Sequence, residues 1–91
     1  MKIGDICCVK YKNGKYSRHF YIYESKPDLN SDNLWHGHGK EHIKANIEYF
    51  VLLEMNDKYN GYSFPKILTV KGIIGYLCLY EIYERLERLD A

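Results

Sequence analysis

The chain has 91 residues, of which 46% are hydrophobic, and a formal net charge of +1 at pH 7. This length accommodates a single domain, residues 1–91, and the balanced charge is unlike that of the strongly basic domains of dedicated nucleic-acid binders. The first residues lack the apolar stretch of a signal peptide, and no run approaches the length of a membrane span. We therefore expect a cytoplasmic protein that does not enter a membrane.

Three features of the composition narrow the class further. Ten tyrosines raise the aromatic fraction to 15%, and tyrosine suits half-buried strand surfaces. The abundance of Lys, Ile, Tyr and Asn beside only three Arg is typical of an AT-rich genome, which is a hint about origin and not about chemistry. Three cysteines, two of them adjacent at Cys7 and Cys8, do not make a disulfide framework. We expect reduced thiols that pack as small apolar side chains.

The N-terminal quarter predicts a β-hairpin. Residues 5–12 and 15–24 are both typical of strands, and the Asn13-Gly14 pair between them is the strongest short-range hairpin signal, because a type I′ turn needs positive φ at both central residues. Six cations against two carboxylates give residues 1–26 a net charge of +4. Residues 26–46, rich in Pro, Asn, Asp, Ser and Gly, then predict a long insert loop, and such loops are usually functional or disordered.

The middle of the chain predicts further strands. Residues 47–55 alternate as a strand does, although a helical stripe beginning near residue 40 also fits the apolar spacing. Residues 56–63 predict a second loop. Residues 66–70 and 73–78 predict a second hairpin that turns at Lys71-Gly72.

The C-terminal segment favours a short helical or 3₁₀ element. Two Glu–Arg pairs stand four residues apart in the order that stabilises a helix, Glu81 with Arg85 and Glu84 with Arg88. Apolar residues at helical spacing support the same prediction: Leu79, Ile82, Tyr83, Leu86 and Leu89.

Short segments near both ends of the chain are similar in sequence to a known family. Five strand-like runs, the opening residues 2–10 (KIGDICCVK), the hairpin at residues 70–77 (VKGIIGYL) and residues 81–86 (EIYERL) together resemble the small SH3-like β-barrels of phages and bacteria. The resemblance implies an all-β, mainly antiparallel barrel that binds peptides, nucleic acids or partner domains through loop and strand surfaces. It implies no single activity, because this architecture hosts many functions.

A histidine-rich stretch is the sharpest candidate for chemistry. Within seven residues it brings together three histidines and one carboxylate, His36, His38, Glu41 and His42. Three imidazoles plus water could hold Zn²⁺ in an open site. The spacing matches no established zinc signature, so incidental histidines on an exposed loop are the alternative. We otherwise expect no cofactor and no enzymatic activity, because the cysteines lie inside apolar strand-like runs where a thiol is usually inert.

The sequence also suggests two candidate binding surfaces, one for nucleic acid and one for a protein partner. Aromatic rings beside cations on the N-terminal hairpin suit single-stranded DNA or RNA, since bases stack on the rings while cations follow the phosphates. The nucleic-acid candidates are Lys10, Tyr11, Lys12, Lys15, Tyr16 and Arg18. Trp35 either covers the core or anchors an interface, and with Tyr21 and Tyr23 it forms the candidate surface for a protein partner.

The sequence thus predicts an all-β, mainly antiparallel, SH3-like barrel with a long insert at residues 26–46. The favoured function is a small non-enzymatic binding or accessory protein, phage-encoded or environmental in origin, with a protein partner. Single-stranded nucleic-acid binding and metal binding are the alternatives. Open edge strands also allow self-association into a homo-oligomer.

Overall fold

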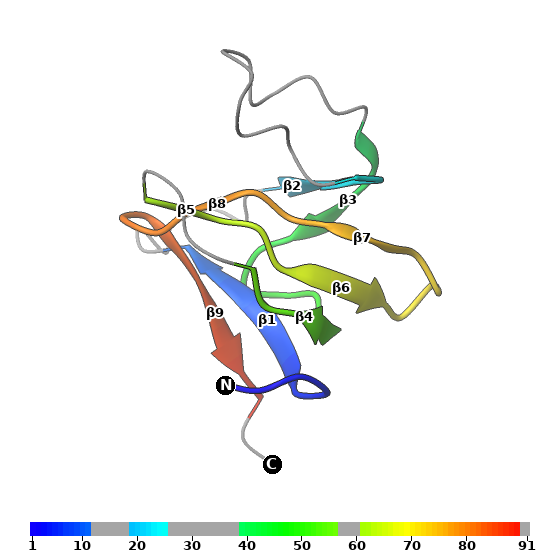
Figure 1. The fold of residues 1–91 in the computed structure, drawn as a ribbon, viewed down its shortest axis with the longest axis horizontal. Helices are drawn as coiled ribbons and strands as arrows, with labels where there is room; N and C mark the ends of the chain where they lie inside the picture. Colours follow the sequence, from blue (N-terminus) through cyan, green and yellow to red (C-terminus); the bar gives the residue numbers. More distant parts are fainter. Residues whose placement is uncertain (12–18, 26–38, 57–60, 90–91) are drawn as a thin grey trace.

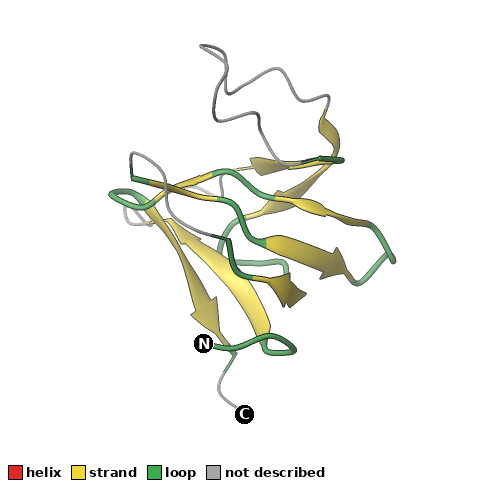
Figure 2. Cartoon of the chain, viewed as in Figure 1, coloured by secondary structure: helices red, strands yellow, loops and turns green. Residues whose placement is uncertain are grey.

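The computed structural model describes residues 1–11, 19–25, 39–56 and 61–89, and within them every regular element is a β-strand (Figure 2). The predicted all-β, mainly antiparallel class is therefore confirmed. The strands are β1 (Ile6–Tyr11), β2 (His19–Tyr23), β3 (Gly39–Lys44), β4 (Phe50–Glu54), β5 (Tyr62–Ser63), β6 (Lys66–Thr69), β7 (Ile74–Tyr76), β8 (Leu79–Tyr80) and β9 (Glu84–Arg88).

Seven strands form one antiparallel sheet in the order β3-β2-β7-β6-β4-β1-β9, and β5 pairs with β8 in a separate two-stranded sheet. Figure 1 shows β2 and β3 in the upper part of the described fold, and β1 and β9 in its lower part. The large sheet ends on β3 at one edge and on β9 at the other.

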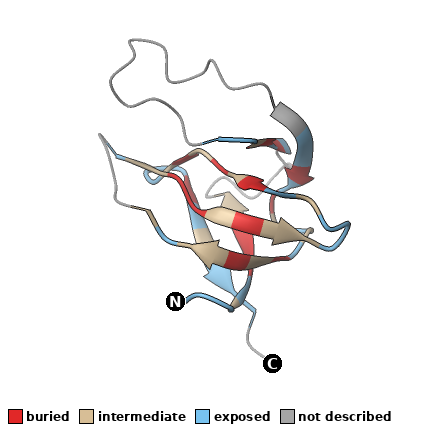
Figure 3. Ribbon diagram, turned by 45° about the vertical axis from the view of Figure 1, so that its right-hand side comes forward, coloured by how far each residue is buried: buried red, intermediate tan, exposed pale blue. Residues whose placement is uncertain are grey.

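The core lies between the inward faces of these strands (Figure 3). Alternation along each strand selects the buried side chains, because successive residues of a strand point to opposite faces. On β2, for example, Phe20 and Ile22 are buried while Tyr21 is exposed. The central core cluster contains Cys7, Val9, Phe20, Ile22, Ile43, Ala45, Phe50, Leu52, Ile67, Leu77 and Leu79. Cys7 and Cys8 are both free and buried, as expected.

The predicted N-terminal hairpin is wrong. Among the described residues β1 pairs with β4 and β9, whereas β2 pairs with β3 and β7. The two strands exist near their predicted positions, but among the described residues each pairs on both edges with strands other than its predicted partner. The Asn13-Gly14 turn lies outside the described residues.

The predicted C-terminal helix is also wrong. Residues 84–88 form β9, which pairs along its whole length with β1 and places Leu86 opposite Val9. Two helical Glu–Arg pairs contribute only about 0.5 kcal/mol each. Strand pairing instead packs Leu86 against the core cluster and extends the sheet by one strand. A single turn precedes β9, where the Tyr83 N–H donates to the Tyr80 carbonyl.

The predicted long insert is shorter than residues 26–46. Its last third forms β3 and the turn that follows, because Ile43 is buried opposite Phe20 of β2. Asn46, with φ of 67°, ends this segment, and its side chain accepts a hydrogen bond from the Tyr11 N–H at 3.3 Å. Residues 26–38 lie outside the described part. The predicted second hairpin is confirmed, since β6 pairs with β7 around Gly72 at φ 84°.

Candidate functional site

Two pockets flank the β2–β3 hairpin. We call the first the tyrosine pocket, and it has a volume of about 340 Å³. Its lining is His19, Phe20, Tyr21, Tyr23, Tyr62, Cys78, Tyr80, Tyr83 and Glu84. This volume lies at the small end of the range for ligand pockets, which suits one or two side chains of a partner.

Strand alternation builds the first wall of the tyrosine pocket. With Phe20 and Ile22 directed into the core, β2 presents His19, Tyr21 and Tyr23 on its outer face. The Tyr21 and Tyr23 ring centroids are 6.5 Å apart. Tyr21 is 53% exposed, so a large aromatic ring stands in water here.

The pairing of β3 with β2 extends this wall. His42 lies directly opposite Tyr21, and their ring centroids are 5.0 Å apart. His19 lies diagonally across from His42, with 5.5 Å between ring centroids in an edge-to-face arrangement. Four aromatic rings thus form one surface patch across two strands.

The opposite wall comes from the small sheet and the turn after it. Tyr62 of β5 pairs with Tyr80 of β8, and their rings are 4.9 Å apart. Tyr83, in the turn before β9, lies 5.6 Å from Tyr80. Gly61 keeps this wall close, because a Cβ there would lie 3.3 Å from the Tyr80 ring.

A thiol and a carboxylate complete the lining. Glu84 is only 4% exposed, and its side chain accepts a hydrogen bond from the Tyr80 N–H. Burial, with Glu84 as a further cause, raises the pKa of the Cys78 thiol to about 11. Burial also raises the pKa of Tyr23. Cys78 is therefore protonated at neutral pH, the opposite of what a nucleophilic cysteine needs.

We call the second pocket the aliphatic pocket, and it has a volume of about 390 Å³. It lies between the β3–β4 turn and the tip of the β6–β7 hairpin. Ile47, 58% exposed, and Val70, 90% exposed, stand at its rim. Its lining is Ile22, Glu41, His42, Ile43, Ile47, Glu48, Tyr49, Thr69, Val70, Lys71 and Ile73. His42 lines this pocket, and its ring also contacts Tyr21 of the tyrosine pocket.

The structure brings together two of the three residues predicted for a protein partner, Tyr21 and Tyr23, and Trp35 lies outside the described residues. Of the predicted metal ligands, only His42 is described, beside His19, while His36 and His38 lie outside. The described part of the chain contains no group of three or more His, Cys, Asp or Glu placed to hold a metal ion.

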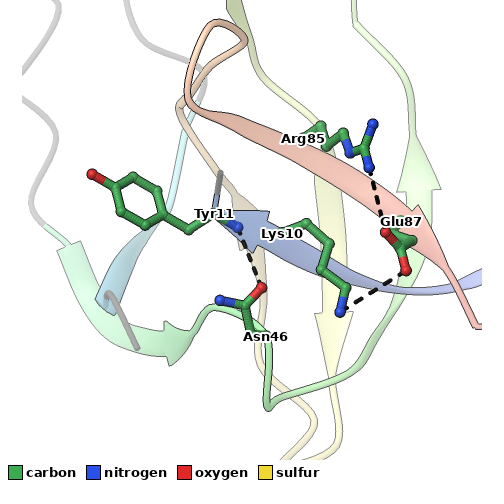
Figure 4. A network of polar contacts seen from close by, with 5 residues as sticks. All are labelled: Lys10, Tyr11, Asn46, Arg85 and Glu87. Atoms are coloured by element: carbon green, nitrogen blue, oxygen red, sulfur yellow. Dashed lines mark hydrogen bonds and ion pairs between the residues drawn. The ribbon is translucent and has the colours of Figure 1, made fainter. Parts of the chain in front are cut away.

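Two of the predicted nucleic-acid residues are described, and both have other contacts (Figure 4). The Lys10 Nζ lies 3.9 Å from Glu87 Oε1 on β9. Tyr11 is half-buried and packs against the core cluster. Lys12, Lys15, Tyr16 and Arg18 lie outside the described residues.

Sequence reasoning missed the second wall of the tyrosine pocket, Tyr62, Tyr80 and Tyr83. Tyr80 and Tyr83 belong to the segment that was predicted to be helical. They line the pocket together with β2 only because residues 79–80 and 84–88 form strands instead. Among the described residues no helix is long and apolar enough to cross a membrane. The chain matches no protein-family model, no curated protein and no solved structure.

Proposed function

We propose that this chain is a small non-enzymatic binding module that holds a protein partner in the tyrosine pocket. The observation that carries the proposal is the pocket's two facing aromatic walls, one from the β2–β3 hairpin and one from the β5–β8 pair and its turn. Tyrosine is enriched among the residues that dominate binding energy at protein interfaces, because it supplies a large rigid ring and a hydroxyl.

The contents of the pocket support binding rather than catalysis. A nucleophilic thiol needs a lowered pKa and a base beside it, whereas the pKa of Cys78 is raised and its neighbour is a carboxylate. The buried Glu84 side chain already accepts a hydrogen bond from the Tyr80 backbone N–H, so its role is to stabilise the turn before β9. These groups shape a surface that a partner side chain can enter.

A peptide-display selection against the folded protein tests the proposal. Enriched peptides are titrated into isotope-labelled protein, and backbone amide shifts are mapped by NMR. We expect the largest shifts at His19–Tyr23 and around Tyr62, Tyr80 and Tyr83. Shifts centred on the aliphatic pocket, or no enriched peptide at all, contradict the proposal.

Nucleic-acid binding is the alternative that charge would support, but of its candidate cations only Lys10 lies in the described part, and Lys10 faces Glu87. Counterion release makes such binding fall steeply with salt, whereas binding in an aromatic pocket changes little. Fluorescence anisotropy with a labelled single-stranded oligonucleotide, at low and at moderate salt, separates the two functions.

We further propose that the seven-stranded sheet is an SH3-like barrel and that the protein works in the cytoplasm. The resemblance of residues 2–10, 70–77 and 81–86 supports the first statement. Three free cysteines, two of them buried, support a reducing compartment.

A further inference from the structure

The last strand, β9, forms one edge of the seven-stranded sheet. Among the described residues its only strand partner is β1, so within that part of the chain its other side is an open edge. The Leu89 N–H donates to the Ile6 carbonyl at 2.7 Å, and these residues stand opposite each other in the β1–β9 register. Because antiparallel strands direct alternate residues toward the partner, the backbone groups of Arg85 and Glu87 face β1 and those of Leu86 face the open edge.

We propose that β9 pairs with β9 of a second copy of this chain, antiparallel and centred on Leu86. A twofold axis at that point makes Leu86 face its own copy with its outward N–H and C=O groups, as a hydrogen-bonded antiparallel pair requires. The inference does not depend on the function proposed for the tyrosine pocket.

The sequence of this segment is self-complementary in that register. Arg85 stands opposite Glu87 of the second copy, and the axis repeats this pair on the other side. Tyr83 stands opposite Leu89 of the second copy, on the same face as the Arg85–Glu87 pairs. Opposite charges and apolar pairs across neighbouring strands stabilise a sheet, and like charges destabilise it.

The solvent-facing side chains make these pairs possible. Tyr83, Arg85, Glu87 and Leu89 are all exposed, and the strand period of two places them on one face. Tyr83 is 47% exposed and Leu89 is 45% exposed, which leaves two apolar side chains in water in the single chain. Glu87 lies 3.9 Å from Lys10 Nζ and 3.8 Å from the Arg85 guanidinium, and Figure 4 draws both ion pairs. A second Arg85 opposite Glu87 would complete a charge network across the axis.

Only this register suits β9. A centre on Arg85 or on Glu87 would place two like charges directly opposite each other. The other edge of the sheet, β3, has no such pattern. Its one carboxylate, Glu41, would face itself, Ile43 or Ala45 in registers centred on residues 41, 42 and 43. Charge complementarity therefore assigns a second copy to the β9 edge and none to the β3 edge.

Sedimentation velocity across protein concentrations from roughly 20 µM to 1 mM tests the proposal, since a pairing of this size is weak. The wild-type protein should show a reversible monomer–dimer equilibrium. Arg85→Glu and Glu87→Arg each put like charges across the axis, so each variant should associate at least about tenfold more weakly. The swap of both residues in one chain restores opposite charges and should restore association.

An equimolar mixture of the two single variants is the sharpest arm. Each variant alone carries like charges at positions 85 and 87, two glutamates in the first variant and two arginines in the second. In a mixed pair the two glutamates of one chain stand opposite the two arginines of the other. The mixture should therefore dimerise more tightly than either variant does alone. Glu41→Lys on the β3 edge is the matched control and should leave association unchanged.

Two results would overturn the proposal. One is a wild-type sedimentation coefficient that does not change with concentration over the whole range. The other is association that survives in both single variants, which would place the contact elsewhere. Circular dichroism melts of each variant show whether the monomer fold is intact, and the mixing arm remains decisive because both of its chains carry a single exposed substitution.

Discussion

The tyrosine pocket and the aliphatic pocket share the β2–β3 hairpin, yet their walls differ in chemistry. The tyrosine pocket is enclosed by paired aromatic rings that contact one another at centroid distances of 4.9 to 6.5 Å. The aliphatic pocket is bordered by turns, with Val70 90% exposed at a hairpin tip. Similar volume therefore does not mean similar capacity for recognition.

The two pockets illustrate that the apolar area of a pocket and its specificity for a ligand are different properties. Aliphatic side chains gain energy from any apolar surface that covers them, in proportion to the area buried. Tyrosine rings also impose geometry and offer hydroxyl groups that need partners, so they discriminate among ligands. Substitutions confined to one pocket therefore show which pocket binds the partner, whereas a substitution beneath the shared β2–β3 hairpin should disrupt both pockets.

Gly75→Ala should have the largest effect, because Gly75 of β7 lies under the hairpin that both pockets share. A Cβ at this position would clash with the Ile22 side chain and lie 2.6 Å from the Tyr23 carbonyl oxygen. Neither strand can move away without losing sheet pairing, so we expect a loss of about 3 kcal/mol in the free energy of unfolding. Urea denaturation followed by circular dichroism measures it.

Ile74→Ala, at the exposed neighbouring position, is the matched control and should cost about 1 kcal/mol or less. Equal losses in the two variants would show that the close approach of β7 to β2 is not a constraint.

Tyr21→Ala should separate the two pockets. The substitution removes an exposed ring from the tyrosine pocket only, and hot-spot tyrosines are worth about 2 kcal/mol or more. Affinity for a peptide selected against the protein should fall by roughly thirtyfold or more. Isothermal titration calorimetry measures it, with Ile47→Ala in the aliphatic pocket as the control. If Ile47→Ala weakens binding and Tyr21→Ala does not, the aliphatic pocket is the binding site.

The two walls of the tyrosine pocket also differ in how far the sequence predicted them. The first wall followed from a local rule, because Tyr21 and Tyr23 alternate with Phe20 and Ile22 along one strand. The second wall depended on the C-terminal segment, whose helical spacing was a genuine local preference. Pairing with β1 overrode that preference, and such long-range pairing leaves no mark within the segment itself.

The same limit explains the N-terminal hairpin. Strand positions and the all-β class could be predicted, since both rest on periodicity and turn residues. Which strands become neighbours could not be predicted, because β4 and β9, which pair with the two edges of β1, come from distant parts of the chain. The pocket, which joins β2 to β5, β8 and the turn after β8, is a product of that topology.

Cys78 provides a probe inside the tyrosine pocket. With the pKa of its thiol raised to about 11 from an ordinary value of 9.0, its thiolate fraction at pH 8 should be about a hundredfold lower than in the unfolded chain. Iodoacetamide should therefore alkylate Cys78 about a hundredfold more slowly in the folded protein than in urea. Mass spectrometry of tryptic peptides follows the rate at this cysteine. A fast folded-state rate would indicate a reactive thiol and would reopen a catalytic function for the pocket.

The raised pKa has a consequence for stability. Because the folded state holds the proton more tightly than the unfolded state, Cys78 contributes stability that is fully present below about pH 9 and is lost as pH rises toward 11. Burial raises the pKa of Cys7, Cys8 and Tyr23 in the same direction. The urea concentration at the midpoint of unfolding should thus decrease as the pH is raised from 9 to 11. The Cys78→Ala variant should show a smaller decrease.

His42→Ala should have the smallest effect and sharpens the boundary between the pockets. His42 lines the aliphatic pocket, and its ring lies 5.0 Å from Tyr21 and 5.5 Å from His19, so its loss removes one ring contact of Tyr21, worth about 0.5–1 kcal/mol, and one of His19. Peptide affinity should fall by only about threefold. Zinc titration of the same variant adds a second measurement, because two imidazoles alone make a poor site for an ion that prefers four ligands. Tight, stoichiometric zinc binding in the wild type that His42→Ala abolishes would make this residue a metal ligand rather than part of a binding wall.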